Sequence, residues 1–329
     1  MSLSPRNNPV LFGHAAAQAT FEAAIQAERV HHAWLLTGPT GVGKATLAFR
    51  LARRLLSPGD PNDPANPVFR RIAAGSHADV LTIERAFDEK RKRMKSGIAV
   101  EQTRAVGAFM HLTAAEGGWR VVILDGADEM NPNAANALLK ILEEPSRRGI
   151  LFLTSDAPGR LLPTIRSRCR RLSLSPLKDE DMAAALGYML PDMGVAERSK
   201  LAAIAEGSPG RAVALAGEGA LAVASLVDEV LAETPGIGIT RMHEVAERAT
   251  KSETGFGTFM ALLQAGLGKA VRSAALEGRN GWGGQGPGRP LAEWGEVWHA
   301  LGRLQDETER FNLDKRTAVI AGLELLSTP

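Results

Sequence analysis

The chain has 329 residues, of which 44% are hydrophobic and 23% charged, a composition typical of folded globular proteins and unlike that of disordered ones. At about 100–200 residues per domain, this length accommodates two or three domains. The formal net charge is only +2, which excludes a polycationic chain. Any contact with nucleic acid therefore requires a local basic patch.

The single cysteine, Cys169, excludes an intramolecular disulfide framework and a cysteine-rich zinc module. We expect it to be a small buried apolar residue and not a nucleophile, because no histidine or asparagine is placed to activate it. The first twenty residues lack the apolar core of a secretory signal, and no stretch reaches the ~20 apolar residues that span a bilayer. We therefore expect a cytoplasmic protein that binds neither a membrane nor a metal such as zinc.

Short apolar segments in the first half of the chain predict the strands of a parallel sheet. They are bounded by turn residues or charges, as buried parallel strands are. They alternate with helical patterns, such as 46–56 and 135–144, in which leucines recur at helical spacing. This alternation predicts an α/β core with a parallel sheet and flanking helices. The five expected strands are 33–37, 80–83, 121–124, 150–153 and 171–174.

Helical patterns replace the strand signals after Pro176. We expect an α/β core over residues 1–175, a small helical domain over 176–220 and an all-α domain over 221–329. Within the core, segment 57–67 has prolines at every third position, a spacing that favours an extended surface connector.

A phosphate-binding loop is predicted where GPTGVGK follows the first expected strand and precedes the first helix. This is the context of a Walker A motif. Gly38, Gly41 and Gly43 allow backbone N–H groups to converge on phosphate, Lys44 supplies a positive charge, and the helix N-terminus adds its dipole.

The groups needed for metal-assisted hydrolysis are missing from this loop. Active P-loops place a metal-binding hydroxyl after the lysine, but this chain has Ala45, and Thr46 lies about 100° further around the helix. Asp125 ends a strand at the Walker B position, where ATPases add a glutamate that polarises water; here Gly126 follows. We therefore expect weak or absent binding of ATP or ADP and no efficient hydrolysis.

Three longer stretches together resemble the clamp-loader branch of the AAA+ family: HHAWLLTGPTGVGK, VVILDGADEMNPNAANALLKILEEP and PTIRSRCRRLSL. Within that branch the chain is similar to the delta-prime type and less to the tau/gamma motor. The resemblance implies an AAA+ core, a three-helix lid and a helical collar that joins a five-subunit ring. It also implies tau/gamma and delta subunits, the sliding clamp and primer-template DNA as partners.

The resemblance also implies roles for particular residues. Arg168, in Ser-Arg-Cys, matches an arginine finger that reaches the ATP of a neighbouring subunit, an effect worth ~10³–10⁵ in rate for GTPases. The sensor 1 position falls at Thr154 or Ser155. The sensor 2 arginine of motor subunits falls at Gly210, with Arg211 one place later, so the role of Arg211 stays open.

We expect a structural subunit of the DNA polymerase III clamp loader, with no ATPase or polymerase chemistry of its own. Two alternatives stay open. A tau/gamma-type ATPase would use Thr46 for the metal and Asp128 as a relay to water. A freestanding DNA-binding module would bind DNA without partners, although the basic run 90–95 is more typical of a solvated loop.

Overall fold

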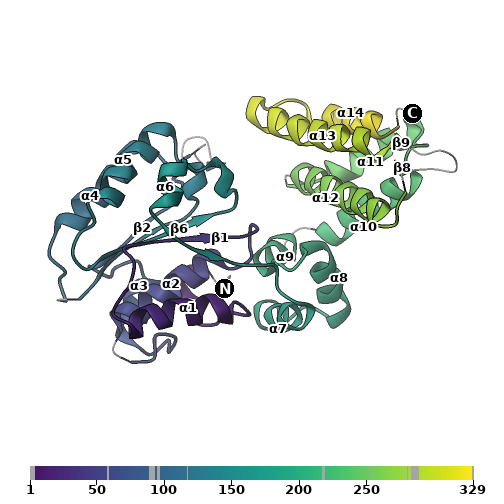
Figure 1. Cartoon of the computed structure of the whole chain (residues 1–329). Coiled ribbons are helices and arrows are strands. Elements are labelled where there is room, and N and C mark those ends of the chain that lie inside the picture. Colours follow the sequence, from purple (N-terminus) through teal and green to yellow (C-terminus); the bar gives the residue numbers. More distant parts are fainter. Residues whose placement is uncertain are drawn as a thin grey trace. The chain divides into compact units, whose positions relative to one another are not determined.

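A computed structural model describes residues 4–57, 59–88, 93–94, 97–116, 118–216, 219–252, 254–279, 281–282 and 289–327 (Figure 1). Most of the basic run therefore lies outside the described residues. The chain forms two compact units. One is Met1–Asp192 with Ala205–Arg211, and the other is Met193–Ile204 with Ala212–Pro329. The three-domain division expected from sequence stays a prediction.

The first unit contains a five-stranded sheet in the order β2-β5-β6-β1-β7, and all its strand pairs are parallel. The α/β core with a parallel sheet is thus confirmed. The polar end of β6 extends beyond the apolar run, to Ser155, which lies opposite Thr37 in the register. The strands are β1 (Ala33–Thr37), β2 (Val80–Ile83), β5 (Arg120–Leu124), β6 (Gly149–Ser155) and β7 (Arg170–Ser173).

Helices cover both faces of this sheet (Figure 1), because successive strand residues point to opposite sides. Trp34 packs in the core on one face, with its ring centroid 5.0 Å from that of Phe21. The next residue, Leu35, belongs to the core on the other face, with Leu138. The first face carries α1 (Ala15–Gln26), α2 (Lys44–Leu56) and α3 (Pro67–Ala73), and the second carries α4 (Val100–His111), α5 (Pro132–Glu143) and α6 (Pro163–Ser167).

Helix α5 begins three residues before the expected position because Asn131 caps it. The Asn131 side chain accepts a hydrogen bond of 2.8 Å from the backbone N–H of Ala134, and Pro132 takes the first helical position, where its missing N–H is harmless. The expected helix therefore exists, with its start set by the cap.

The proline-rich segment 57–67 is not extended, so this prediction is wrong. The Asp60 carboxylate accepts a hydrogen bond of 2.9 Å from the backbone N–H of Asn62, and the Asp63 carboxylate one of 2.8 Å from that of Ala65. Such local bonds hold aspartates in turns, which compete with an extended backbone.

The second unit is helical, as expected. Its core includes the buried Trp294 with Phe259 and Leu323. No helix in the described part of the chain is long and apolar enough to cross a membrane. The helices after β7 are α7 (Asp179–Met189), α8 (Val195–Ala205), α9 (Pro209–Ala216), α10 (Ala220–Glu233), α11 (Ile239–Ala249), α12 (Gly255–Leu276), α13 (Leu291–Phe311) and α14 (Lys315–Ser327). Two short antiparallel pairs also occur: β3 (Phe87–Asp88) with β4 (Arg93–Met94), and β8 (Gly281–Trp282) with β9 (Arg289–Pro290). Three short 3-10 helices in the described residues lie at Pro5–Asn7, Ala127–Glu129 and Pro158–Arg160.

Candidate nucleotide site and arginine surface

The predicted phosphate loop connects β1 to α2, as the Walker A motif requires. Gly41 has a φ of 77° and Gly43 one of 115°, both in the left-handed region that favours glycine. A Cβ atom on Gly41 would lie 2.5 Å from the backbone nitrogen of Arg211. The glycines expected from the motif are therefore required by the backbone itself.

The Lys44 ammonium is buried in this loop and is bound on several sides. It donates hydrogen bonds of 2.9 Å to the carbonyl of Gly38 and 2.7 Å to that of Pro39, and it forms an ion pair with Asp156. An ammonium has three N–H donors, and these three acceptors match them in number. The motif predicts that Lys44 binds a phosphate, but its hydrogen-bond donors already have acceptors within the chain.

Ala45, which has no hydroxyl, is the second residue of α2 and directly follows Lys44. Thr46 follows in the same turn and is half-buried. Among the described residues, no group of three or more His, Cys, Asp or Glu side chains is arranged to hold a metal ion. Whether the loop binds ATP or ADP stays a prediction.

Asp125 lies at the end of β5 and contacts the sensor 1 region. Its carboxylate accepts a hydrogen bond of 2.5 Å from the Thr154 hydroxyl, which in turn accepts one of 2.9 Å from the N–H of Gly126. The Ser155 hydroxyl is buried and has no hydrogen-bond partner in the described part of the chain. Of the two residues that sequence analysis left open for sensor 1, Thr154 is the one that touches the Walker B aspartate.

The acidic residues after Asp125 have other partners. Asp128 accepts hydrogen bonds from the backbone N–H groups of Asp156 (3.2 Å) and Ala157 (3.1 Å), and Glu129 pairs with Arg85 at 2.8 Å. Burial raises the pKa of Glu129 against the opposing charge of Arg85, and nearby carboxylates raise it further. Both carboxylates are thus bound to groups of the chain itself.

Arg211 lies near the loop through its backbone, whereas its side chain is bound elsewhere. The N–H of the preceding residue, Gly210, donates a hydrogen bond of 2.8 Å to the carbonyl of Gly41. The Arg211 guanidinium pairs with Glu206 at 3.4 Å. A role for Arg211 as a phosphate sensor therefore stays a prediction.

Arg168 follows the last residue of α6 and is oriented by two acceptors. One guanidinium nitrogen donates a hydrogen bond of 2.8 Å to the Glu143 carboxylate, and another donates one of 3.0 Å to the carbonyl of Thr164. The side chain is 35% exposed. The structure therefore places this guanidinium at the surface, on elements that do not form the chain's own phosphate loop.

The residues after Arg168 turn back onto the sheet. The Arg170 guanidinium lies over the Trp34 ring, 5.0 Å from its centroid, and Arg171 donates a hydrogen bond of 3.1 Å to the Thr37 hydroxyl. Cys169 is half-buried, less completely than expected, and burial raises the pKa of its thiol to about 12. Cys169 is therefore protonated at neutral pH, as an inert core residue would be.

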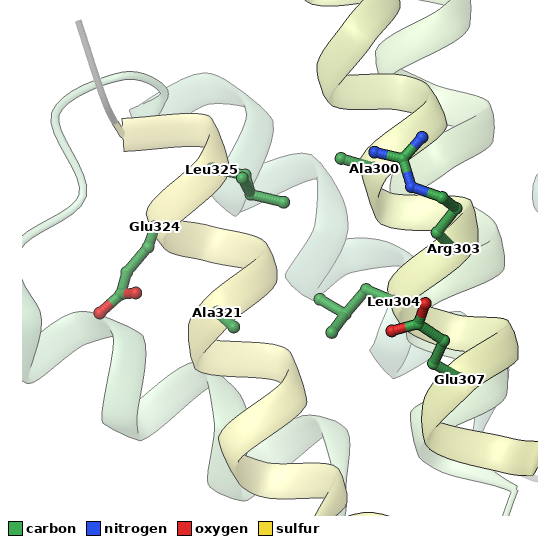
Figure 2. Close-up of a pocket in the computed structure, with 7 residues that line it drawn as sticks. All are labelled: Ala300, Arg303, Leu304, Glu307, Ala321, Glu324 and Leu325. Atoms are coloured by element: carbon green, nitrogen blue, oxygen red, sulfur yellow. The ribbon is translucent and has the colours of Figure 1, made fainter. Parts of the chain in front are cut away.

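A separate cavity of about 450 Å³ lies in the second unit. Leu304 of α13 and Ala321 and Leu325 of α14 face each other across it (Figure 2). Four of the seven lining residues are apolar and three are charged. Its lining consists of Ala300, Arg303, Leu304, Glu307, Ala321, Glu324 and Leu325.

Comparisons with known proteins find a matching family and several similar relatives. The family described as "DNA polymerase III, delta subunit" matches residues 13–178. The DNA polymerase III subunit delta' of Pseudomonas aeruginosa is 42% identical over 194 residues, which cover 57% of this chain and 56% of the relative. That of Escherichia coli is 34% identical over 198 residues, covering 59% and 57%. The DNA polymerase III subunit gamma of Buchnera aphidicola is 32% identical over 165 residues, covering 49% and 43%.

The alignments therefore cover only part of each relative's length. The chain spans little more than half the length of the delta' relatives. The matched family region contains the phosphate loop, Asp125, Asp156 and Arg168.

Proposed function

The chain belongs to the DNA polymerase III, delta subunit family, and on that premise we propose that it is a structural, delta'-type subunit of a clamp loader. In this role it supports the ATP-dependent loading of a sliding clamp onto primed DNA without hydrolysing ATP itself. It contributes Arg168 to the ATP site of an adjacent subunit.

The observation that carries this proposal is the position of Arg168. Its guanidinium is held at the surface by Glu143 and by the carbonyl of Thr164, so it is oriented and accessible before any partner docks. A guanidinium delivered to a neighbour's γ-phosphate stabilises the charge that develops there during phosphoryl transfer. The chain's own loop, with Ala45 and Gly126, lacks the groups for that reaction.

The proposed partners are the tau/gamma and delta subunits, the sliding clamp and primer-template DNA. The names of the relatives, subunit delta' and subunit gamma of DNA polymerase III, support membership of that assembly. Between the two types, the two highest of these identities, 42% and 34%, belong to subunit delta'. The tau/gamma-type ATPase is less well supported, because Asp128, its proposed relay, binds the backbone of the loop after β6.

The test is a reconstitution with tau/gamma and delta subunits of the same organism, in which ATP turnover and clamp loading are measured with and without this chain. We expect no turnover by the isolated chain and a large loss of loading when the chain is omitted. The Lys44→Met variant serves as the control for contaminating ATPase. Turnover by the isolated chain that approaches that of the complex, and that disappears with Lys44→Met, would contradict the proposal.

A further inference from the structure

The carboxylate of Asp156 lies against the phosphate loop, and its two oxygens bind two different residues of that loop. One oxygen forms the ion pair with the Lys44 ammonium. The other accepts a hydrogen bond of 2.5 Å from the Thr40 hydroxyl. A phosphate bound in a Walker A loop is held by the same kinds of donor, a lysine ammonium and polar groups of the loop.

Because Lys44 is buried, its positive charge needs the Asp156 carboxylate as a partner. The Lys44 side chain is 7% exposed, whereas that of Asp156 is 45% exposed. A buried ammonium loses its hydration and is stable only when it is paired and hydrogen-bonded. The carbonyls of Gly38 and Pro39 are neutral, so the negative charge comes from Asp156.

The position of Asp156 is fixed by the neighbouring acidic loop. The Asp128 carboxylate accepts hydrogen bonds from the backbone N–H groups of Asp156 and Ala157, which holds the turn after β6 in place. An intramolecular ligand held in this way is already ordered, so it competes with a free ligand at a high effective concentration. A nucleotide would have to displace it.

Displacement would also bring negative charges together. Asp125, Asp128 and Asp156 are close enough to Glu129 for their charges to act on it. A triphosphate entering the loop would therefore approach several carboxylates, while Ala45 offers no hydroxyl to a compensating magnesium ion. Like charges at close range disfavour binding.

We propose that Asp156 is the resident anion of the phosphate loop and the residue that excludes nucleotide from it. The loop then keeps its P-loop backbone as a structural element, with a carboxylate in place of a phosphate. This inference concerns the isolated chain and holds whether or not Arg168 acts in trans.

The experiment measures binding of a fluorescent ADP and of ATP to the full chain, with and without magnesium, for the native protein, Asp156→Asn and Asp156→Ser. Asparagine keeps the shape of the side chain and removes its charge, and serine removes both. We expect both variants to bind nucleotide at least tenfold more tightly than the native chain. Adding Lys44→Ala to Asp156→Asn is expected to abolish the gain, which locates the binding in this loop.

The matched control is Asp192→Asn, which removes the same charge from an exposed position of the first unit and is expected to leave nucleotide affinity unchanged. Circular dichroism and thermal unfolding establish that each variant is folded. Equal affinities of the native chain and of a folded Asp156→Asn or Asp156→Ser variant would overturn the proposal. A gain that survives Lys44→Ala, or that Asp192→Asn reproduces, would overturn it as well.

Discussion

The Arg168 guanidinium donates a hydrogen bond of 2.8 Å to the Glu143 carboxylate, which joins the end of α6 to the end of α5. A second bond to the carbonyl of Thr164 fixes the plane of the guanidinium. The arginine is thereby ordered while a third of its side chain stays exposed. Ordering before docking reduces the entropy that association must overcome.

The first prediction concerns the stability of this ion pair. Because both side chains are partly exposed, Glu143→Gln is expected to lower the free energy of unfolding by less than about 1 kcal/mol. Urea denaturation provides the measurement, and Glu144→Gln, at the next exposed position, is the control. A loss well above about 2 kcal/mol would mean that the pair is part of the packed core.

The second prediction concerns the backbone of the phosphate loop. Gly41→Ala is expected to destabilise the first unit by about 1–3 kcal/mol, since Gly41 has a φ of 77° and a new Cβ would lie 2.5 Å from the Arg211 nitrogen. Thermal unfolding measures the effect. Gly159→Ala is the matched control, because a Cβ there meets no atom within 4 Å, and it is expected to be nearly neutral. Equal effects of the two substitutions would argue against this loop geometry.

The third prediction is a loss of stability at mildly acidic pH. Burial lowers the pKa of His14, His32 and His77 below the ordinary value of 6.5. As the pH falls below about 6.5, the unfolded chain therefore binds more protons than the folded chain, and the free energy of unfolding decreases. The Tm is expected to fall between about pH 7.5 and about pH 5.5.

Substitutions of two separate histidines test this pH dependence. His14 contacts the carbonyl of Val42 through Nε2 at 3.0 Å, and His14→Gln is expected to reduce the slope of Tm against pH. His243→Gln, at an exposed position of the second unit, is expected to leave the slope unchanged. A slope that responds to His243 and not to His14 would contradict the assignment.

The fourth prediction concerns the thiol of Cys169, whose pKa burial raises to about 12. Because the thiolate is the reactive form, alkylation by iodoacetamide at about pH 8 is expected to be roughly 100-fold or more slower in the folded chain than in the chain unfolded in urea. Mass spectrometry of the alkylated fraction over time gives both rates. Similar rates in the two states would show that the thiol is accessible and ionised.

Much of the α/β core was predictable because its strands are short apolar runs between charges and turns. The strand 33–37 has the predicted bounds, and β6 is longer than its apolar run because Thr154 and Ser155 are polar residues that pair with β1. Helix α1 escaped prediction, since its buried residues are alanines and Phe21 and it has no leucine repeat.

The parts of the site that lie within local sequence motifs were predictable. The phosphate loop follows from residues that are adjacent in the chain, and so does the missing hydroxyl at Ala45. The pairings of Lys44 with Asp156 and of Arg168 with Glu143 join distant segments. They depend on how the strands and helices are arranged, which no local pattern contains. The one local signal for the pairing with Lys44 was Asp156, an aspartate directly after the expected sensor 1 position.

The most direct test of the account is the ATP turnover of the reconstituted clamp loader with Arg168→Ala in this chain, compared with Arg166→Ala, an exposed arginine two residues earlier. Both complexes are first shown to assemble, by size-exclusion chromatography. We expect Arg168→Ala to lower DNA-stimulated turnover at least tenfold, since arginines that act in trans contribute ~10³–10⁵ in rate in GTPases, and Arg166→Ala to leave it nearly unchanged. Turnover that is unchanged by Arg168→Ala in a fully assembled complex would contradict the central claim.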